Sequence, residues 1–128
     1  MISAMRTARP TGDVDRVREF YEQVVGLPVL WTFVDHDGFD GVIFGVPNET
    51  SQLELVKTPH FVEPTPSIED ALVLYCEAHA AVDMVQRLRS AGARELLGQD
   101  PTLNPYWERT GAVAFVDPDG YRLIVARS

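Results

Sequence analysis

The sequence predicts an α+β fold made of two modules with the same order of elements, one strand, one helix and then three strands (βαβββ). Two observations carry this prediction. Each half of the 128 residues holds one helical stripe of apolar residues, with short strand-like runs before and after it. A proline-bearing stretch, about residues 59–69, separates the halves. We expect one domain, 1–128, with modules of about 1–58 and 70–128, whose curved mixed sheets enclose a cavity and carry the helices on their outer faces.

The first module is defined by its apolar spacing and its turn residues. Residues 2–8 form a short strand. Residues 11–13 (Thr-Gly-Asp) then supply the cap of a helix, in which apolar residues recur at helical spacing until Gly26 ends it. Turn sequences punctuate the strand-like runs that follow. The strands predicted there are 29–34, 41–46 and 52–57.

The second module repeats this order. Residues 71–76 are apolar and read as a buried strand, and a second helical stripe follows, which Gly92 ends. The last two strands are joined by 117–120 (Asp-Pro-Asp-Gly), a turn sequence with a clear conformational basis. The strands predicted after the helix are 93–97, 112–116 and 121–126.

Charge and composition exclude several classes of partner. The chain has 11 basic and 19 acidic residues, a formal net charge of −8. We expect no nucleic acid partner and no membrane partner, because a basic footprint is missing. The single cysteine, Cys76, excludes an internal disulfide and a thiolate zinc cluster, and we expect it to be an inert core residue. With no signal-peptide core and no apolar run that could cross a bilayer, the chain is expected to be cytoplasmic.

Three motifs and the doubled element order together resemble the vicinal oxygen chelate (VOC) superfamily, which includes glyoxalase I, extradiol dioxygenases, fosfomycin resistance proteins and bleomycin resistance proteins. The motifs are Phe20-Tyr21-Glu22 with Gly26-Leu27 after it, Leu53-Glu54-Leu55, and Asp117-Pro118-Asp119-Gly120-Tyr121. The resemblance spans nearly the whole chain. It implies the glyoxalase/bleomycin-resistance fold, a small-molecule ligand and a homodimer. Function does not follow from it, because the superfamily hosts several chemistries and also non-enzymes.

The resemblance also implies four metal-ligand positions, of which this sequence keeps one. Metal-dependent members have a His on the first strand, where this chain has Arg6, and a Glu on the fourth strand, which Glu54 matches. Residues 70–73 hold no His for the third position, and Ile124 stands where the fourth ligand is a Glu. A guanidinium has hydrogen-bond donors and no lone pair to give a metal. We therefore expect Arg6 to neutralise Glu54, and we expect neither a metal nor another cofactor.

Strand alternation extends the candidate cavity. If Arg6, Glu54 and Ile124 share the inner face, a period of two adds further polar side chains to it. The predicted ligand-binding residues are Arg6, Gln52, Glu54, Tyr75, Tyr106, Trp107 and Arg122. Two of these, Tyr106 and Trp107, belong to a predicted loop before the seventh strand and would form an aromatic wall. The alternatives are a purely structural Arg6–Glu54 ion pair, and a hydrophobic lid or dimer contact for the aromatic loop.

Other polar residues are expected at the surface. His36, His60 and His79 lack the spacing of a metal pair or of a base beside a nucleophile. A weak ion site at His36 with its two aspartate neighbours is the alternative. Arg122 has the alternative of extending to the cavity rim.

The sequence leaves three functions open, and we favour the first. It is a metal-independent binder of a small molecule, similar to the bleomycin-resistance branch, towards which the acidic chain would steer a cationic ligand. The second is a VOC-type enzyme (a lyase, isomerase or dioxygenase) with Glu54 as the catalytic base, Arg6 or Arg122 as the electrophilic stabiliser and Tyr75 or Tyr106 as the proton donor. The third is an accessory module whose cavity is filled by its own side chains.

Overall fold

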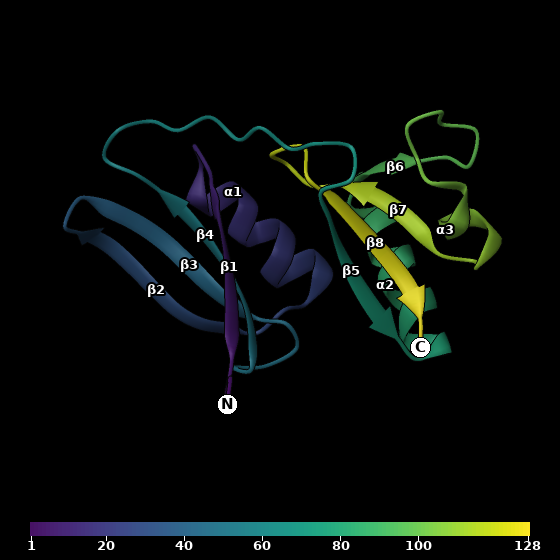
Figure 1. The fold of residues 1–128 in the computed structure, drawn as a ribbon, viewed down its shortest axis with the longest axis horizontal. Coiled ribbons are helices and arrows are strands. Elements are labelled where there is room, and N and C mark those ends of the chain that lie inside the picture. Colours follow the sequence, from purple (N-terminus) through teal and green to yellow (C-terminus); the bar gives the residue numbers. More distant parts are fainter. The chain divides into compact units, whose positions relative to one another are not determined.

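A computed structural model describes residues 1–128, which form two compact units, Met1–Pro64 and Thr65–Ser128. Each unit has a four-stranded sheet with helices, and the βαβββ order occurs twice, so the predicted α+β fold class is confirmed (Figure 1). The first unit contains β1 (Met5–Pro10), α1 (Val14–Arg18), the π-helix η1 (Glu19–Val25), β2 (Val29–His36), β3 (Phe39–Gly45) and β4 (Ser51–Lys57). The second contains β5 (Ala71–Cys76), α2 (Ala78–Ser90), β6 (Arg94–Leu96), α3 (Pro105–Arg109), β7 (Val113–Val116) and β8 (Arg122–Arg127).

The two sheets have the same strand order. It is β1-β4-β3-β2 in the first unit and β5-β8-β7-β6 in the second. In each sheet the first strand pairs in parallel with the last strand of its module, and all other pairs are antiparallel. The ladder between β2 and β3 slips twice, between Val29 and Trp31 and between Phe33 and His36. Both sheets are therefore mixed, as the sequence predicts.

The helix of the first unit packs on one face of its sheet. Its buried residues include Val17, Tyr21 and Val25, and the buried sheet residues include Leu53 and Leu55 of β4. These two leucines alternate along β4 with Gln52 and Glu54, which therefore point to the other face of the sheet. We call the face that carries Glu54 the inner face of the first sheet.

The first helix begins where the sequence predicts and then departs from α geometry. The Asp13 carboxylate caps it by accepting a hydrogen bond from the backbone N–H of Arg16 at 3.1 Å. From Glu19 to Val25 the chain forms a π-helix, in which the neighbouring rings of Phe20 and Tyr21 are buried. Gly26 ends the helix with a left-handed φ of 90°, which glycine adopts without strain.

One prediction about the second unit is wrong. The sequence around Tyr106 and Trp107 is expected to form a loop, whereas the structure forms the short helix α3 there. The side-chain oxygen of Asn104 caps this helix by accepting a hydrogen bond from the Tyr106 N–H at 3.0 Å, and Pro105 occupies the first turn. Both residue types are typical of a helix start. None of the helices is both long and apolar enough to span a membrane.

Candidate functional site

The inner face of the first sheet carries three of the predicted site residues. In the parallel ladder between β1 and β4, Arg6 pairs with Gln52, two residues before Glu54. Side chains two positions apart on a strand point to the same face, so Gln52 and Glu54 both lie beside Arg6. The structure thus brings together the three residues that the alternation predicts for this strand pair.

A hydrogen-bond network joins these three side chains. The Arg6 guanidinium donates from Nε to Oε1 of Gln52 at 2.9 Å and from Nη1 to Oε1 of Glu54 at 3.2 Å. Gln52 in turn donates from Nε2 to the backbone carbonyl of Glu49 at 2.8 Å. The Arg6 side chain is 42% exposed and that of Glu54 is 18% exposed. The Nη2 group of Arg6 and the Oε2 atom of Glu54 remain without a partner in the chain and can bond a ligand.

A cavity of about 390 Å³ lies over this ion pair. It is lined by Arg6, Phe33, His36, Asp37, Phe39, Ile43, Glu54 and Val56. Gly41 makes room for one wall, because a Cβ at that position would overlap the ring of Phe33 and approach the carbonyl oxygen of Leu55. The cavity therefore has apolar and aromatic walls and one polar end formed by Arg6 and Glu54.

Sequence reasoning missed five lining residues of this cavity, namely Phe33, His36, Asp37, Phe39 and Ile43. His36 is exposed, as predicted, but it also lines the cavity, with its ring centroid 6.4 Å from that of Phe33. Phe33 could not be assigned to a face from alternation alone. The pairing of Phe33 with Gly41, which itself pairs with Val56, now places it on the inner face. His60 and His79 are exposed, as expected.

The second sheet uses the same register with different residues. In the first sheet, Arg6 pairs with Gln52, and Glu54 follows two residues later. In the second sheet, Ala71 pairs with Arg122, and Ile124 follows two residues later. We call the face that carries Ile124 the inner face of the second sheet. Ile124 is 1% exposed there and forms an apolar cluster with Leu96 and Ala114. The partly buried residues packed against this cluster are Ala71, Val73, Leu103, Trp107, Ala112 and Val116.

The other four predicted site residues belong to the second unit. Trp107 packs against the apolar cluster, and its ring centroid lies 5.0 Å from that of Tyr106, which is 46% exposed. Tyr75 is 64% exposed on β5. Arg122 donates from Nη1 to the carbonyl oxygen of Thr102 at 2.8 Å and from Nη2 to Oγ1 of the same residue at 2.6 Å. The ligand-binding roles of these four residues stay predictions.

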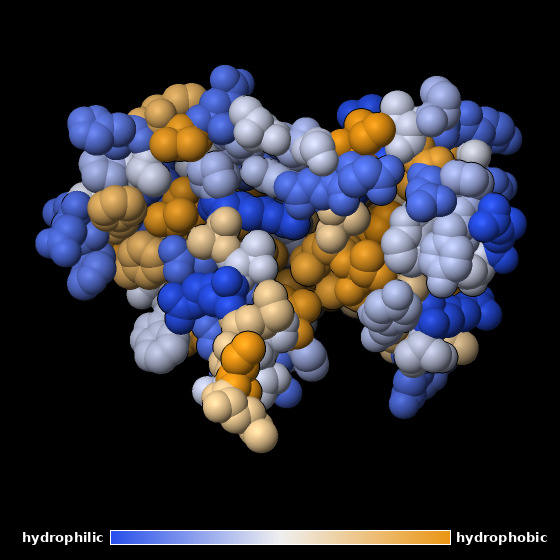
Figure 2. All heavy atoms as spheres, viewed as in Figure 1, coloured by the Kyte–Doolittle hydropathy of each residue, from blue (hydrophilic) through white to orange (hydrophobic).

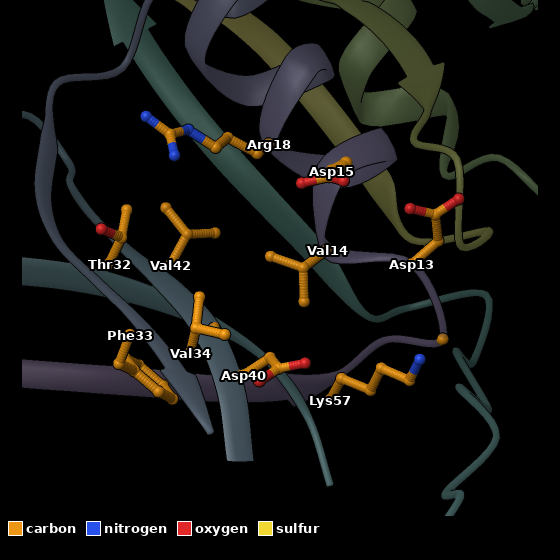
Figure 3. A pocket seen from close by; sticks show the side chains of 12 residues that line it. Asp13, Val14, Asp15, Arg18, Thr32, Phe33, Val34, Asp40, Val42 and Lys57 are labelled. Atoms are coloured by element: carbon orange, nitrogen blue, oxygen red, sulfur yellow. The ribbon is translucent and has the colours of Figure 1, made fainter. Parts of the chain in front are cut away.

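A second cavity, of about 490 Å³, lies on the helix side of the first sheet (Figure 3). Its lining comes from the start of α1, from β2 and β3, and from Lys57 at the end of β4. Two of its charged groups are bonded within the chain. Arg18 donates to Glu22 at 2.7 Å, and Asp40 accepts from the Asp35 N–H at 2.7 Å. We call this cavity the helix-side groove.

Metal-ligating side chains do not gather in this structure. No group of three or more His, Cys, Asp or Glu side chains could hold a metal ion. On the inner face of the first sheet, the Glu54 carboxylate has the Arg6 guanidinium as its neighbour. The corresponding register positions of the second sheet hold Ala71 and Ile124.

Comparison with known proteins gives a consistent assignment. Residues 5–56 match the YycE-like N-terminal domain and residues 69–127 match the YycE-like C-terminal domain. The uncharacterised protein YycE of Bacillus subtilis (strain 168) is 34% identical over 126 residues, which cover 97% of this chain and 87% of that protein. A 2.0 Å crystal structure of a YycE protein of unknown function from Bacillus subtilis, named there as a candidate glyoxalase/fosfomycin resistance protein, superposes with a TM-score of 0.87 at 31% identity, covering 99% of this chain and 90% of that chain.

More distant structures share the fold alone. The trypanothione-dependent glyoxalase I of Leishmania major has a TM-score of 0.72 at 21% identity, covering 95% of this chain and 84% of that chain. The fosfomycin resistance protein FosX of Listeria monocytogenes, in complex with Mn(II), has a TM-score of 0.67 at 8% identity, covering 98% of this chain and 90% of that chain. The doubled module, the domain matches and the Bacillus relative agree, and this chain belongs to the YycE-like family of the vicinal oxygen chelate superfamily.

Proposed function

We propose that this protein binds a small molecule on the inner face of its first sheet and does so without the superfamily's metal ion. The observation that carries the proposal is the hydrogen bond from Arg6 to Glu54 at 3.2 Å, inside a cavity of about 390 Å³. The positive charge of the guanidinium stands where a metal would otherwise neutralise the carboxylate. Cavities of this volume are in the usual range for small-molecule sites.

The residues at the four implied ligand positions do not fit a metal ion. Arg6 offers only donors, and Ala71 and Ile124, at the corresponding positions of the second sheet, offer no donor atom for a metal. Glu54 is left as a single carboxylate whose Oε1 already accepts a hydrogen bond from Arg6. The Mn(II) of FosX therefore has no counterpart in the chemistry of these residues.

The cavity indicates what kind of molecule would fit. Phe33 and Phe39 give it aromatic walls, and Ile43 and Val56 add apolar surface. At the polar end, Nη2 of Arg6 can donate to a ligand acceptor while Oε2 of Glu54 can accept from a ligand donor. A neutral or cationic molecule with an apolar body and a neighbouring donor and acceptor satisfies both groups.

The first experiment measures metal retention. The protein is incubated with Mn, Fe, Co, Ni or Zn salts, desalted, and analysed for bound metal. We expect far less than one equivalent to remain. Near-stoichiometric retention would contradict the proposal, because no group of three or more His, Cys, Asp or Glu side chains is arranged here to hold a metal ion.

The second experiment locates the ligand. A library of small aromatic compounds is screened by thermal shift, since a ligand at 100 times its Kd stabilises the folded state by about 2.7 kcal/mol. The shift should disappear in Arg6→Ala and persist in Arg18→Ala, a matched removal of an arginine from an ion pair beside the helix-side groove. A shift lost only in Arg18→Ala would move the site to that groove and refute the proposal.

An enzymatic function has one specific observation in its favour. Glu54 and His36 line the same cavity, so a proton acceptor and a second proton carrier both reach a bound molecule. In this alternative Glu54 is the catalytic base and Arg6 stabilises the negative charge that develops. Glu54→Gln would then abolish turnover while ligand binding survived. If the protein only binds its ligand, neither the parent nor the Glu54→Gln variant shows turnover.

We also propose that the protein is a homodimer, since members of the superfamily commonly pair their modules across a two-fold axis. Light scattering after size-exclusion chromatography tests this directly. A mass of twice 14.3 kDa supports the dimer, and a mass of 14.3 kDa at all concentrations contradicts it.

A further inference from the structure

One segment of the second unit covers the inner face of its sheet. Residues 97–112 connect β6 to β7 and contain α3, and we call them the covering segment. From this segment, Leu103 and Trp107 pack against the apolar cluster of Leu96, Ala114 and Ile124. The face that in the first sheet lies open above Glu54 is therefore occupied here by the chain itself.

The covering segment is bonded to itself rather than to the sheet. Its backbone hydrogen bonds run from Asp100 N–H to Leu97, from Leu103 to Asp100, from Trp107 to Asn104, from Thr110 to Tyr106, from Gly111 to Glu108 and from Ala112 to Trp107. Every one of these bonds joins two residues of the segment. The sheet ladder resumes only where Val113 pairs with Val125 and Leu96 with Ala114. The segment can thus leave the sheet without breaking any backbone hydrogen bond to it.

Arg122 of β8 forms hydrogen bonds with the covering segment, and Arg94 of β6 adds an electrostatic interaction with Asp100. Arg122 donates to the carbonyl oxygen of Thr102 at 2.8 Å and to its Oγ1 at 2.6 Å. The Thr102 hydroxyl also donates to Asp100 Oδ1 at 2.6 Å, and its N–H donates to the same atom at 2.8 Å. These bonds hold the pKa of Asp100 below its ordinary value, so Asp100 stays charged and keeps Thr102 oriented towards Arg122.

Both ends of the covering segment have glycine. Gly111 has a φ of 76°, and a Cβ there would meet nothing within 4 Å, so this glycine is needed for its backbone angle and not for space. At the other end, a Cβ on Gly98 would overlap the Glu108 carboxylate, the flexible end of a side chain from the same segment. Two glycine positions at the ends of a self-bonded segment are suitable pivots for its movement.

The surface beneath the covering segment has a definite chemistry. Its floor is the apolar cluster of Leu96, Ala114 and Ile124. Figure 2 shows further hydrophobic residues over β5 and β8 that remain uncovered in this view, so the apolar surface continues beyond the segment. Arg122 points to the same face, because it lies two residues before Ile124 on β8. If the segment moves away, the Arg122 guanidinium loses both of its acceptors and needs new ones. The exposed site then offers an apolar floor beside a planar, bidentate cation.

We propose that the inner face of the second sheet is a binding site for a flat aromatic molecule that carries a carboxylate, and that the covering segment occupies this site when the molecule is absent. The ring of the ligand takes the place of the Trp107 indole. Its two carboxylate oxygens take the place of the two Thr102 oxygens that now accept from Arg122. The proposal concerns residues of the second unit only and is independent of the ligand proposed for the first sheet.

The test uses the fact that the chain has two tryptophans. Trp31→Phe leaves Trp107 as the only tryptophan, and Trp31 is 63% exposed, so its loss is tolerated. Phenylacetate is titrated into this variant while the Trp107 emission is followed. We expect a saturable shift of the emission to longer wavelength, as the indole moves into water. Phenethylamine, which has the same ring and the opposite charge, should give no shift.

Two variants identify the arginine involved. Arg122→Gln should weaken phenylacetate binding, measured by calorimetry, by roughly tenfold or more, because a charged hydrogen bond is lost. Arg127→Gln, an exposed arginine on the same strand, should bind as the parent does. An unchanged Trp107 emission at millimolar phenylacetate would overturn the proposal. Equal weakening by both variants would overturn it too, since a general charge effect would then suffice.

Hydrogen exchange of backbone amides tests the opening of the covering segment without phenylacetate or any other added ligand. The amides of residues 97–112 should exchange together and faster than those of β7 and β8, and Arg122→Gln should speed up their exchange while Arg127→Gln should not. Exchange of the segment at the same rate as the two strands would mean that the cover does not open separately, and the proposal would fail.

Discussion

Ile124 lies on β8 at the register position that Glu54 occupies on β4. On β4, Glu54 lies two residues after Gln52, which pairs with Arg6 of β1. On β8, Ile124 lies two residues after Arg122, which pairs with Ala71 of β5. One backbone arrangement therefore supports two different surfaces. The first sheet presents an ion pair under an open cavity, and the second presents an apolar cluster under its own chain.

A carboxylate introduced on the inner face of the second sheet should lower the free energy of unfolding. Ile124→Glu places a charge at a side chain that is 1% exposed and packed in an apolar cluster. We expect a loss of about 3 kcal/mol or more in the free energy of unfolding, measured in urea, because the charge is buried and the cation on that face, Arg122, already donates to Thr102. Arg127→Glu on the same strand is exposed and should change stability by less than about 1 kcal/mol. Similar effects for both variants would contradict the buried cluster.

The ion pairs Arg6–Glu54 and Arg18–Glu22 of the first unit should contribute different amounts to the free energy of unfolding. Arg6→Ala leaves Glu54, with only 18% of its side chain exposed, without its partner, and we expect a loss of about 1–2 kcal/mol. Arg18→Ala removes a helical pair with the spacing i,i+4 and should cost about 0.5 kcal/mol or less. Urea unfolding of the two variants at pH 7 measures the difference. A larger cost for Arg18→Ala would show that the Arg6–Glu54 pair is dispensable.

Removing the Trp107 ring should destabilise the fold more than removing the Tyr106 ring. Trp107→Ala removes a ring packed against the apolar cluster, and we expect a loss of about 2 kcal/mol, less than for a fully buried tryptophan. Tyr106→Ala removes a ring that is 46% exposed and should cost clearly less. Thermal unfolding compares them. Equal losses would indicate that Trp107 does not rest on the sheet as described.

The Arg89–Glu95 pair predicts a pH dependence with a definite sign. Hydrogen bonds from Arg89 at 2.7 and 2.9 Å lower the pKa of Glu95 below its ordinary value, and they raise the pKa of Arg89. A carboxylate with a lowered pKa in the folded state contributes stability above its unfolded pKa of about 4.3, and loses it as the pH falls through the lower folded value.

The stability difference between the parent and Glu95→Gln should therefore be largest near neutral pH and shrink below about pH 4. Urea unfolding at a series of pH values measures it, and Arg89→Gln should remove the same part of the pH dependence. A difference that stays constant from pH 7 to pH 3 would rule out the ion pair as its source.

Cys76 should react slowly with alkylating agents. Partial burial raises the pKa of its thiol, and the charge of Arg87 offsets this only in part. Because the thiolate is the nucleophile, a raised pKa leaves less of it at pH 8. We expect iodoacetamide to modify Cys76 more slowly than a free thiol such as glutathione, and equally fast modification would contradict the raised pKa.

The sequence predicts the fold well because independent signals agree in both modules. Apolar spacing, helix caps and turn residues together define all eight strands and the two main helices, with boundary differences of a few residues. Two features escape prediction. Apolar spacing does not distinguish the π-turns of η1 from α-turns. The helix α3 is too short for a period to show, and only Asn104 and Pro105 indicate its start.

The candidate site was predictable only where strand alternation decides it. Arg6, Gln52 and Glu54 meet because their strands pair in register, which alternation captures. The bonds between Arg122 and Thr102 depend on the path of a connection 20 residues away in sequence. No local pattern encodes that path, just as none assigned His36 to the cavity wall.

The irregular ladder of β2 bears on how the protein behaves at high concentration. This strand forms an outer edge of its sheet and exposes Trp31 and Val34, features that invite other chains to add strands and aggregate. The two slips in its pairing with β3, and the left-handed φ of 50° at Asp35, interrupt the even row of N–H and C=O groups that such growth needs. The protein should therefore resist aggregation along this edge despite the apolar side chains that it exposes.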